Sequence, residues 1–86
     1  MADVLITPVA PAAASAWPYS LQLDYDGNHN PIYIGMAKAG SALTESAWLI
    51  QQLTYDGANN LTAKRYANGS LAFTQRWDER LTLSYF

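Results

Sequence analysis

The chain of 86 residues contains no cysteine and only one histidine, His29. Without thiols it can form neither disulfides nor thiolate metal sites. One imidazole in a predicted turn gives little support to a zinc site, which takes three or four ligands, or to a catalytic triad, which also needs a positioned nucleophile. We expect His29 to be a solvent-exposed turn residue.

The carboxylates are also poor candidates for catalysis. Asp78 and Glu79 are adjacent in a predicted strand, so their side chains point to opposite faces and make a poor acid and base pair. No other constellation of nucleophile, base or metal ligands stands out. The sequence predicts a protein that is not an enzyme, with no catalytic residues, no cofactor and no bound metal.

Charge and long apolar runs are scarce as well. Five Lys and Arg residues against seven Asp and Glu residues leave a net charge of −2, which provides no field to hold a nucleic-acid backbone. No apolar run approaches the roughly 18 to 20 residues that span a bilayer, and the start of the chain lacks the basic region of a signal peptide. We expect no nucleic-acid partner, no membrane partner, and synthesis in the cytosol without a cleaved leader.

Aromatic residues, by contrast, are abundant, with three Trp, six Tyr and two Phe. They mark a repeated pattern, W-x-x-x-L-x-L-x-Y, which fits residues 17–25 and 77–85, and a copy one residue shorter covers 48–55. Each tryptophan begins one copy, and Asp-Gly follows the first two. The pattern predicts a single β domain over residues 17–86, in which one strand is used three times.

The repeat also predicts how the strands pack. Alternation of apolar and polar residues over 19–25 is typical of a half-buried strand. Leu23, Leu53 and Leu83 occupy equivalent positions two residues before a tyrosine. We expect these three leucines to meet in one core.

Two hairpins follow from the turn signals. Residues 19–36 read as strands on either side of the turn cluster 26–30, and residues 48–67 read as strands on either side of 56–60. The second hairpin changes phase in its first strand, which predicts a β-bulge near Gln51-Gln52.

A third hairpin is predicted at Asn68-Gly69, because a type I′ turn needs positive φ at both central residues and these two tolerate it best. Residues 70–75 should then pair back on 61–67, with Leu71 and Phe73 facing the core, and residues 77–85 should form the last strand. The fold class is therefore all-β: a small antiparallel barrel or a compact sandwich of about six strands, built from hairpins.

Residues 1–16 form a separate, Ala- and Pro-rich segment. Pro8 and Pro11 exclude a helix across its middle and favour an extended N-terminal arm. Three readings stay open: a disordered terminus, an edge strand within the chain, and an arm laid on a neighbouring subunit. The third is suggested by its apolar residues, Val4, Leu5, Ile6 and Val9.

The predicted last strand is the other candidate for assembly. Open sheet edges usually carry charge or proline, and residues 82–86 carry neither. We expect residues 81–86 to be paired along their length, either closing a barrel against 17–25 or accepting residues 4–6 of a neighbouring subunit. The assembly residues at this end are Leu83, Tyr85 and Phe86.

Ligand sites are weakly indicated. The spacing Asp24-x-Asp26-Gly27-Asn28-x-Asn30 resembles a calcium loop, but its glycine and its twelfth position do not fit, and turn formation explains the same residues. Tyr33 and Tyr66 are the candidates for stacking on a ligand, because they alternate with apolar neighbours on the returning strands.

Two resemblances extend this reading. Residues 53–62, with the later Asn68-Gly69, resemble the YD repeats of large β-shell proteins. Over residues 22–85 the chain resembles small uncharacterised virion-associated proteins of tailed bacteriophages. The shared residues are Asn30 to Gly35, Ala39-Gly40, Trp48-x-Ile50, Leu53 to Asp56, Ala67 to Gly69, Phe73 and Trp77-Asp78-x-Arg80.

The phage resemblance implies a virion setting, with the protein made in the host cytoplasm, and it carries no functional residues with it. It favours a non-enzymatic structural subunit of the tail, the head-tail junction or the head surface, as in capsid decoration. Such a homo-oligomer would contact other virion proteins through its arm and sheet edges. The alternative is a small β-module that binds carbohydrate or peptide through exposed aromatic residues.

Overall fold

The structure is a computed structural model that describes residues 18–86. These residues form four strands and one short 3-10 helix: β2 (Tyr19–Tyr25), β3 (Pro31–Lys38), β4 (Trp48–Tyr55), β5 (Leu61–Tyr66) and η1 (Trp77–Glu79). The all-β prediction is confirmed for them. The predicted arm, with Val4, Leu5, Ile6 and Val9, lies outside the described residues.

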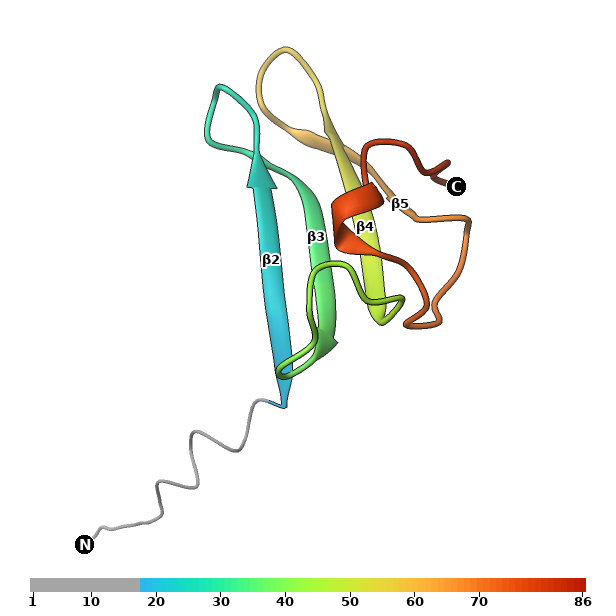
Figure 1. Cartoon of the computed structure of the whole chain (residues 1–86). Coiled ribbons are helices and arrows are strands. Elements are labelled where there is room, and N and C mark those ends of the chain that lie inside the picture. Colours follow the sequence, from blue (N-terminus) through green and yellow to red (C-terminus); the bar gives the residue numbers. More distant parts are fainter. Residues whose placement is uncertain (1–17) are drawn as a thin grey trace, which may run out of the picture.

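The strands make one antiparallel sheet in the order β2-β3-β4-β5, shown in Figure 1. Two hairpins, β2 with β3 and β4 with β5, stand side by side because β3 also pairs with β4. Their turns lie at the same end of the sheet (Figure 1). Both of these predicted hairpins are confirmed.

The turns of the two hairpins are built alike. In each turn the aspartate Oδ1 accepts hydrogen bonds from the backbone N–H groups two and four residues later, at 2.8 and 3.0 Å for Asp26 and at 2.9 and 3.0 Å for Asp56. The fourth turn residue has a φ of 65° in both, at His29 and at Asn59. Aspartate and asparagine favour this geometry because their short polar side chains bond to the nearby backbone.

The strand pairing is irregular in both hairpins just before the turn, between Asp24 and Tyr25 and between Thr54 and Tyr55. The predicted bulge near Gln51-Gln52 is therefore wrong, since both glutamines pair in regular register with β3 and β5. The change of phase in β4 has another cause. Its first half buries one face and its second half buries the other.

One face of the sheet, which we call the covered face, is crossed by the chain that follows β5 (Figure 1). The core lies there, made of Ala37, Trp48, Ile50, Ala67 and Trp77. Gly35 leaves room for the indole of Trp77, because a Cβ built on Gly35 would lie 2.7 Å from Cζ3 of that ring. The two indoles pack with their ring centroids 6.1 Å apart.

The prediction of a barrel or sandwich of about six strands is wrong for residues 18–86, which contain one open sheet of four strands. Asn68 and Gly69 do adopt the predicted positive φ values, 53° and 65°. Residues 70–75, which follow this turn, do not return along β5. Only Gln75 pairs, and it exchanges two backbone hydrogen bonds with Trp48 at the end of β4 that β5 leaves uncovered.

The segment 70–75 is not a strand facing the core, and Leu71 is 68% exposed. Ser70 bends it locally, because Ser70 Oγ accepts a hydrogen bond from the N–H of Ala72 at 3.0 Å. Phe73 is also exposed, and its ring stacks on that of Tyr19 with the centroids 6.0 Å apart.

Residues 77–85 were expected to form the last strand and instead begin as η1. The N–H of Arg80 donates to Trp77 O at 3.1 Å, and the N–H of Thr82 donates to Glu79 O at 2.9 Å. The Arg80 guanidinium explains this fold: it pairs with Asp24 of β2 at 3.0 Å and lies 4.6 Å from the centre of the Trp77 ring. A straight strand would separate these groups.

Residues 81–86 are paired only in part, so the prediction of pairing along their whole length is wrong. Tyr66 and Phe86 exchange two backbone hydrogen bonds of 3.0 Å, and the N–H of Asn68 donates to Ser84 O at 2.7 Å. Leu81 is 71% exposed. The partner is the end of β5, and the barrel does not close against β2.

The three equivalent leucines do not meet in one core. Leu83 packs against the core on the covered face. Leu23 and Leu53 belong to the opposite face, because Leu23 pairs in register with Ile34, which pairs with Gln51, and Leu53 lies two residues further along β4. The third copy of the repeat is not a strand, which removes the equivalence.

Candidate functional site

Two surfaces could carry function, and the first is the fork between the hairpins. The pairing of β3 with β4 ends at Tyr33 and Gln52, and beyond it the two hairpins separate. Two hydrogen bonds bridge the fork: Asn30 Nδ2 donates to Asn59 Oδ1 at 3.0 Å, and the Tyr55 hydroxyl donates to Pro31 O at 2.8 Å. These two hydrogen bonds fix the positions of the two turns relative to each other.

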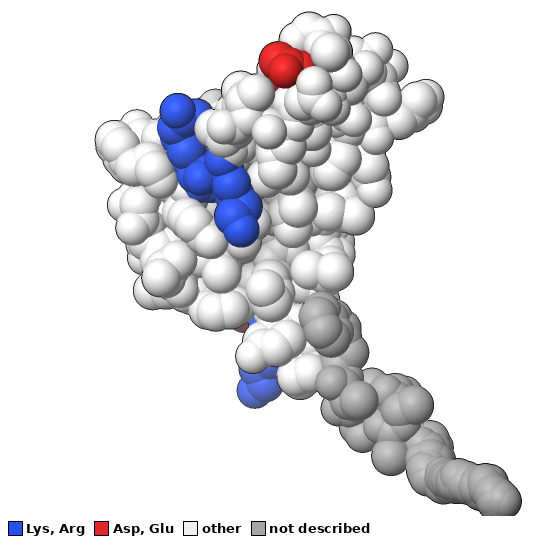
Figure 2. Space-filling model, turned by 180° about the vertical axis from the view of Figure 1, so that it is seen from behind, with Lys and Arg blue, Asp and Glu red and all other residues white. Residues whose placement is uncertain are grey.

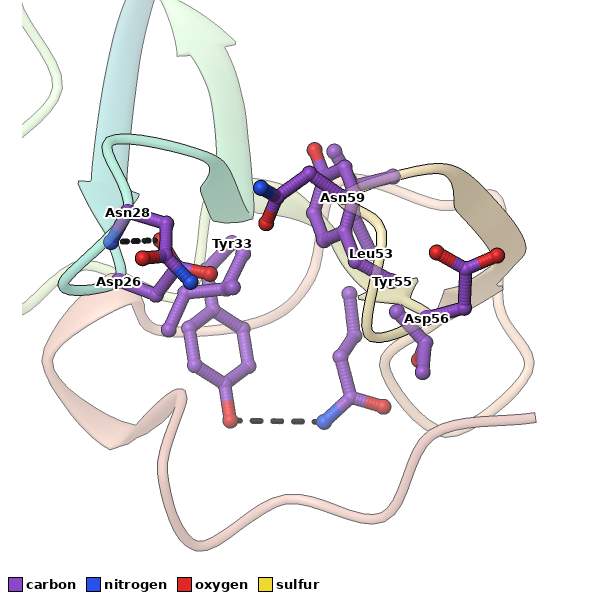
Figure 3. Close-up of a pocket in the computed structure, with 10 residues that line it drawn as sticks. Asp26, Asn28, Tyr33, Leu53, Tyr55, Asp56 and Asn59 are labelled. Atoms are coloured by element: carbon purple, nitrogen blue, oxygen red, sulfur yellow. Dashed lines mark hydrogen bonds between the residues drawn. The ribbon is translucent and has the colours of Figure 1, made fainter.

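A depression of about 440 Å³ lies in this fork. Figure 3 shows that both turns border it, with the Tyr33 ring on one side and Leu53 and Tyr55 on another. Asp26 and Asn59 contribute polar groups from the two turns. The site therefore combines two aromatic rings with amide and carboxylate side chains, which suits a small polar ligand that also offers an apolar surface.

The carboxylates of the fork serve the turns. The backbone N–H groups of Asn60 and Ala58, which donate to Asp56, lower the pKa of that carboxyl below its ordinary value of 3.8. Such an ionised carboxylate is a hydrogen-bond acceptor and has no proton to give at neutral pH. The geometry thus supports binding, and it offers neither an activated nucleophile nor an acid and base pair among the lining residues.

The structure separates the two tyrosines predicted to stack on a ligand. Tyr33 lines the depression but is half-buried. The centroids of the Tyr33 and Tyr85 rings lie 5.6 Å apart, and the Tyr33 hydroxyl accepts a hydrogen bond from Gln52 Nε2 at 3.4 Å. Tyr66 is half-buried on β5 and does not line the depression. Tyr55 was missed, although its place in the repeated turn at an offset of 30 from Tyr25 was visible in the sequence.

The second surface is the face of the sheet opposite the covered face, which we call the open face. The register places alternate residues of each strand there, and those on β2 are the row Tyr19, Leu21, Leu23 and Tyr25, while β3 adds Ile34 and Met36. Leu21, Leu23 and Tyr25 are 46%, 44% and 52% exposed. The apolar side of β2 thus faces outward, against the expectation that it points into the core.

The open face is almost uncharged. Figure 2 shows it from behind, largely white, with Lys and Arg in one strip over the upper left part and again near the lower end, and a small acidic patch at the top. The strand register assigns only Lys38 and Lys64 among the charged strand residues to this face. Asp24, the one acid of β2, lies on the covered face with Arg80. Strong alternation marked this strand in the sequence, but alternation does not say which side is covered.

The predicted assembly residues at the end of the chain have different surroundings. Leu83 and Tyr85 pack against the core, and the Tyr85 hydroxyl donates to Arg80 O at 2.8 Å. Burial, with a smaller contribution from Tyr33, raises the pKa of Tyr85 to about 12. Phe86 is 73% exposed. Leu83 and Tyr85 therefore attach the final segment to its own sheet, and Phe86 remains accessible.

The remaining candidates behave as turn or structural residues. His29 is exposed in the first turn, as predicted. The carboxylates in the calcium-like spacing are engaged by Arg80 and by backbone N–H groups. Across residues 18–86 no group of three metal-ligating side chains comes together, and no helix within this range is long and apolar enough to cross a membrane.

Comparison with known proteins gave no match to a family model, to a curated protein or to a solved structure.

Proposed function

We propose that this protein is a non-enzymatic structural subunit of a tailed-phage virion, where it forms a homo-oligomer and contacts other virion proteins. The virion setting comes from the resemblance over residues 22–85. The observation that carries a structural role is the row of apolar side chains on β2. Leu21, Leu23 and Tyr25 are close to half exposed there, on a face to which the register assigns only two charged strand residues, Lys38 and Lys64.

Physical reasons connect this row to assembly. Soluble monomers rarely expose large contiguous apolar patches, and such patches mark interaction surfaces. β2 is also an edge strand of the sheet, with Asp24 as its one charged residue and no proline between its ends. Asp24 is already paired with Arg80, so it protects this edge little, and weakly protected edges pair readily with other chains. Arm, edge and face together give a subunit that binds its neighbours over an extended surface.

Two measurements test the proposal. Sedimentation velocity of the full chain over a range of concentrations should show a rising mass. Mass spectrometry of purified particles from the source of the chain should detect the protein at a fixed ratio to the major virion proteins. A chain that stays monomeric at high concentration and is absent from the particles would exclude the structural role.

A second function is favoured by the fork, where Tyr33 and Tyr55 border the depression together with Asp26 and Asn59. Aromatic rings beside amides and carboxylates are suited to carbohydrate, so the alternative is a small carbohydrate- or peptide-binding module. A glycan array read with tryptophan fluorescence tests it. Binding that is weakened by Asn59→Ala but not by Thr62→Ala, which lies on β5 outside the depression, would support this function; no binding to any glycan or peptide would remove it.

A further inference from the structure

Within residues 18–86 no second layer packs on the open face, and Leu21 and Leu23 of β2 stay 46% and 44% exposed. On the covered face, residues 67–86 supply that layer and bury Trp48 and Ile50 completely. On the open face Leu53 of β4 is buried, but most of the β2 row stays uncovered, and Phe73 stacks on Tyr19 at one end of β2. Stable domains are built from two packed layers, so an apolar sheet face calls for a partner.

The chain contains a segment with the right chemistry for this face. Residues 1–17 carry one charged residue, Asp3, and their larger aliphatic side chains are Val4, Leu5, Ile6 and Val9. The segment precedes Pro18, whose carbonyl accepts a hydrogen bond of 2.8 Å from the N–H of Ala39 at the start of the strand that carries the exposed row.

The sequence and the length of this segment favour a neighbouring copy as its partner. Five turn residues of the described chain have positive φ, and all are glycine, asparagine or histidine: His29, Gly40, Asn59, Asn68 and Gly69. Residues 1–17 contain none of these three residue types, so a return onto their own sheet would have to do without the positive-φ turns that both hairpins use. Extended at roughly 3.3 Å per residue, positions 4–6 reach about 40 Å from Pro18, beyond the roughly 24 Å of the seven residues of β2.

We propose that the open face, centred on Leu21 and Leu23 of β2 with Ile34 and Met36 of β3, is the acceptor for residues 4–9 of a neighbouring copy of this chain. Each copy gives one segment and receives one. This inference rests on the proposed structural function and specifies its contact. In this proposal the open face takes the place of residues 81–86 as the acceptor. The backbone of Phe86 already pairs with Tyr66 at the end of β5.

Site-directed disulfide cross-linking tests the contact, and the absence of native cysteine makes each link unambiguous. Full-length Ile6→Cys is mixed with full-length Leu23→Cys and oxidised mildly, and Leu21→Cys is a second acceptor variant. The expected result is a disulfide-linked heterodimer on a non-reducing gel, since cross-linking requires Cα atoms within about 7 Å. The matched control acceptor is Leu81→Cys, because Leu81 is 71% exposed and lies outside the open face.

The outcomes are distinct. Linking to Leu21→Cys or Leu23→Cys between chains, with none to Leu81→Cys, supports the proposal. An internal link in a chain that carries both Ile6→Cys and Leu23→Cys, with no link between chains, would show that the segment covers its own sheet and would overturn it. Links between two Leu23→Cys chains alone would indicate two open faces packed together, and would also overturn it.

A charge substitution gives an independent measurement. Leu23→Asp should weaken self-association at least about tenfold in sedimentation, because docking would remove water from the new carboxylate, while Leu81→Asp should leave it unchanged. Circular dichroism should report the same fold for both, since both leucines are exposed. If the chain assembles and Leu23→Asp has no effect, the acceptor is wrong and the structural function stands; a chain that neither assembles nor cross-links removes both.

Discussion

The two hairpins of this protein share their local structure and differ in their surroundings. Equivalent residues of the two hairpins lie 30 positions apart in the sequence. The hairpins share the turn, the irregular pairing before it and the positive φ of the fourth turn residue. Leu23 is nevertheless 44% exposed, whereas Leu53 is 8% exposed. The difference arises because β2 is an edge strand and β4 is a central one. The shared turn residues therefore produce the same local backbone in both hairpins, and position in the sheet sets burial.

A second contrast concerns the covered face. Gly35 of the first hairpin is equivalent to Arg65 of the second, at the same offset of 30. Trp77 packs on Gly35, whereas Arg65 is exposed on β5. The final segment therefore closes over the first hairpin and the centre of the sheet.

The largest expected effect on stability comes from adding a side chain at Gly35. Gly35→Ala should lower the free energy of unfolding by about 3 kcal/mol, because the new Cβ would collide with the buried Trp77 ring. Arg65→Ala at the equivalent position should change it by less than about 0.5 kcal/mol. Urea denaturation of both variants measures the pair, and an unchanged midpoint for Gly35→Ala would contradict the packing of Trp77.

Truncating the equivalent leucines should sharpen the contrast between edge and centre. Leu53→Ala should cost about 2 kcal/mol, as expected for a buried leucine that borders an existing depression. Leu23→Ala should cost less than about 1 kcal/mol at concentrations where the chain is a monomer, because its side chain stays close to half exposed. Equal losses in thermal or urea unfolding would show that the edge strand is buried in solution.

The equivalent tyrosines should differ less. Tyr55→Phe removes the hydrogen bond from its hydroxyl to Pro31 O, which bridges the fork, and should cost about 1 kcal/mol. Tyr25→Phe is the matched control, because Tyr25 is 52% exposed and should lose almost nothing. The unfolding midpoints of the two variants measure the difference; if they shift together, the hydroxyl of Tyr55 does not hold the hairpins.

The smallest effect concerns pH. The folded pKa of Asp56 lies below its ordinary value of 3.8, so its contribution to stability is present above pH 3.8 and is lost as the pH falls through the lower folded value. Asp56→Asn should flatten the dependence of the unfolding midpoint on pH in this acidic window and leave the dependence above pH 5 unchanged. An identical acid profile for the variant and the natural chain would show that the turn bonds do not favour the charged form.

Much of the local structure was predictable from the sequence. Asp-Gly-x-x-Asn turns, the alternation over 19–25 and the positive φ at Asn68-Gly69 depend on contacts between near neighbours, and all three appear in the structure. The fork was not predictable, because it arises where the pairing of β3 with β4 stops at Tyr33 and Gln52. Sequence periodicity contains no information on where two hairpins separate.

The sequence by itself determined the four strands of the two hairpins, their turns and the all-β class, because hydrogen bonding and side-chain alternation over a few residues are local properties. The tertiary structure alone decided which face is covered and what the third copy of the repeat becomes. Residues 77–85 carry the pattern of a strand, yet the packing of Trp77 on Gly35 and the pairing of Arg80 with Asp24 turn them into η1 and a short crossing segment. These contacts join residues more than 40 positions apart, so only the folded chain brings them together, and by doing so it leaves the apolar side of β2 exposed.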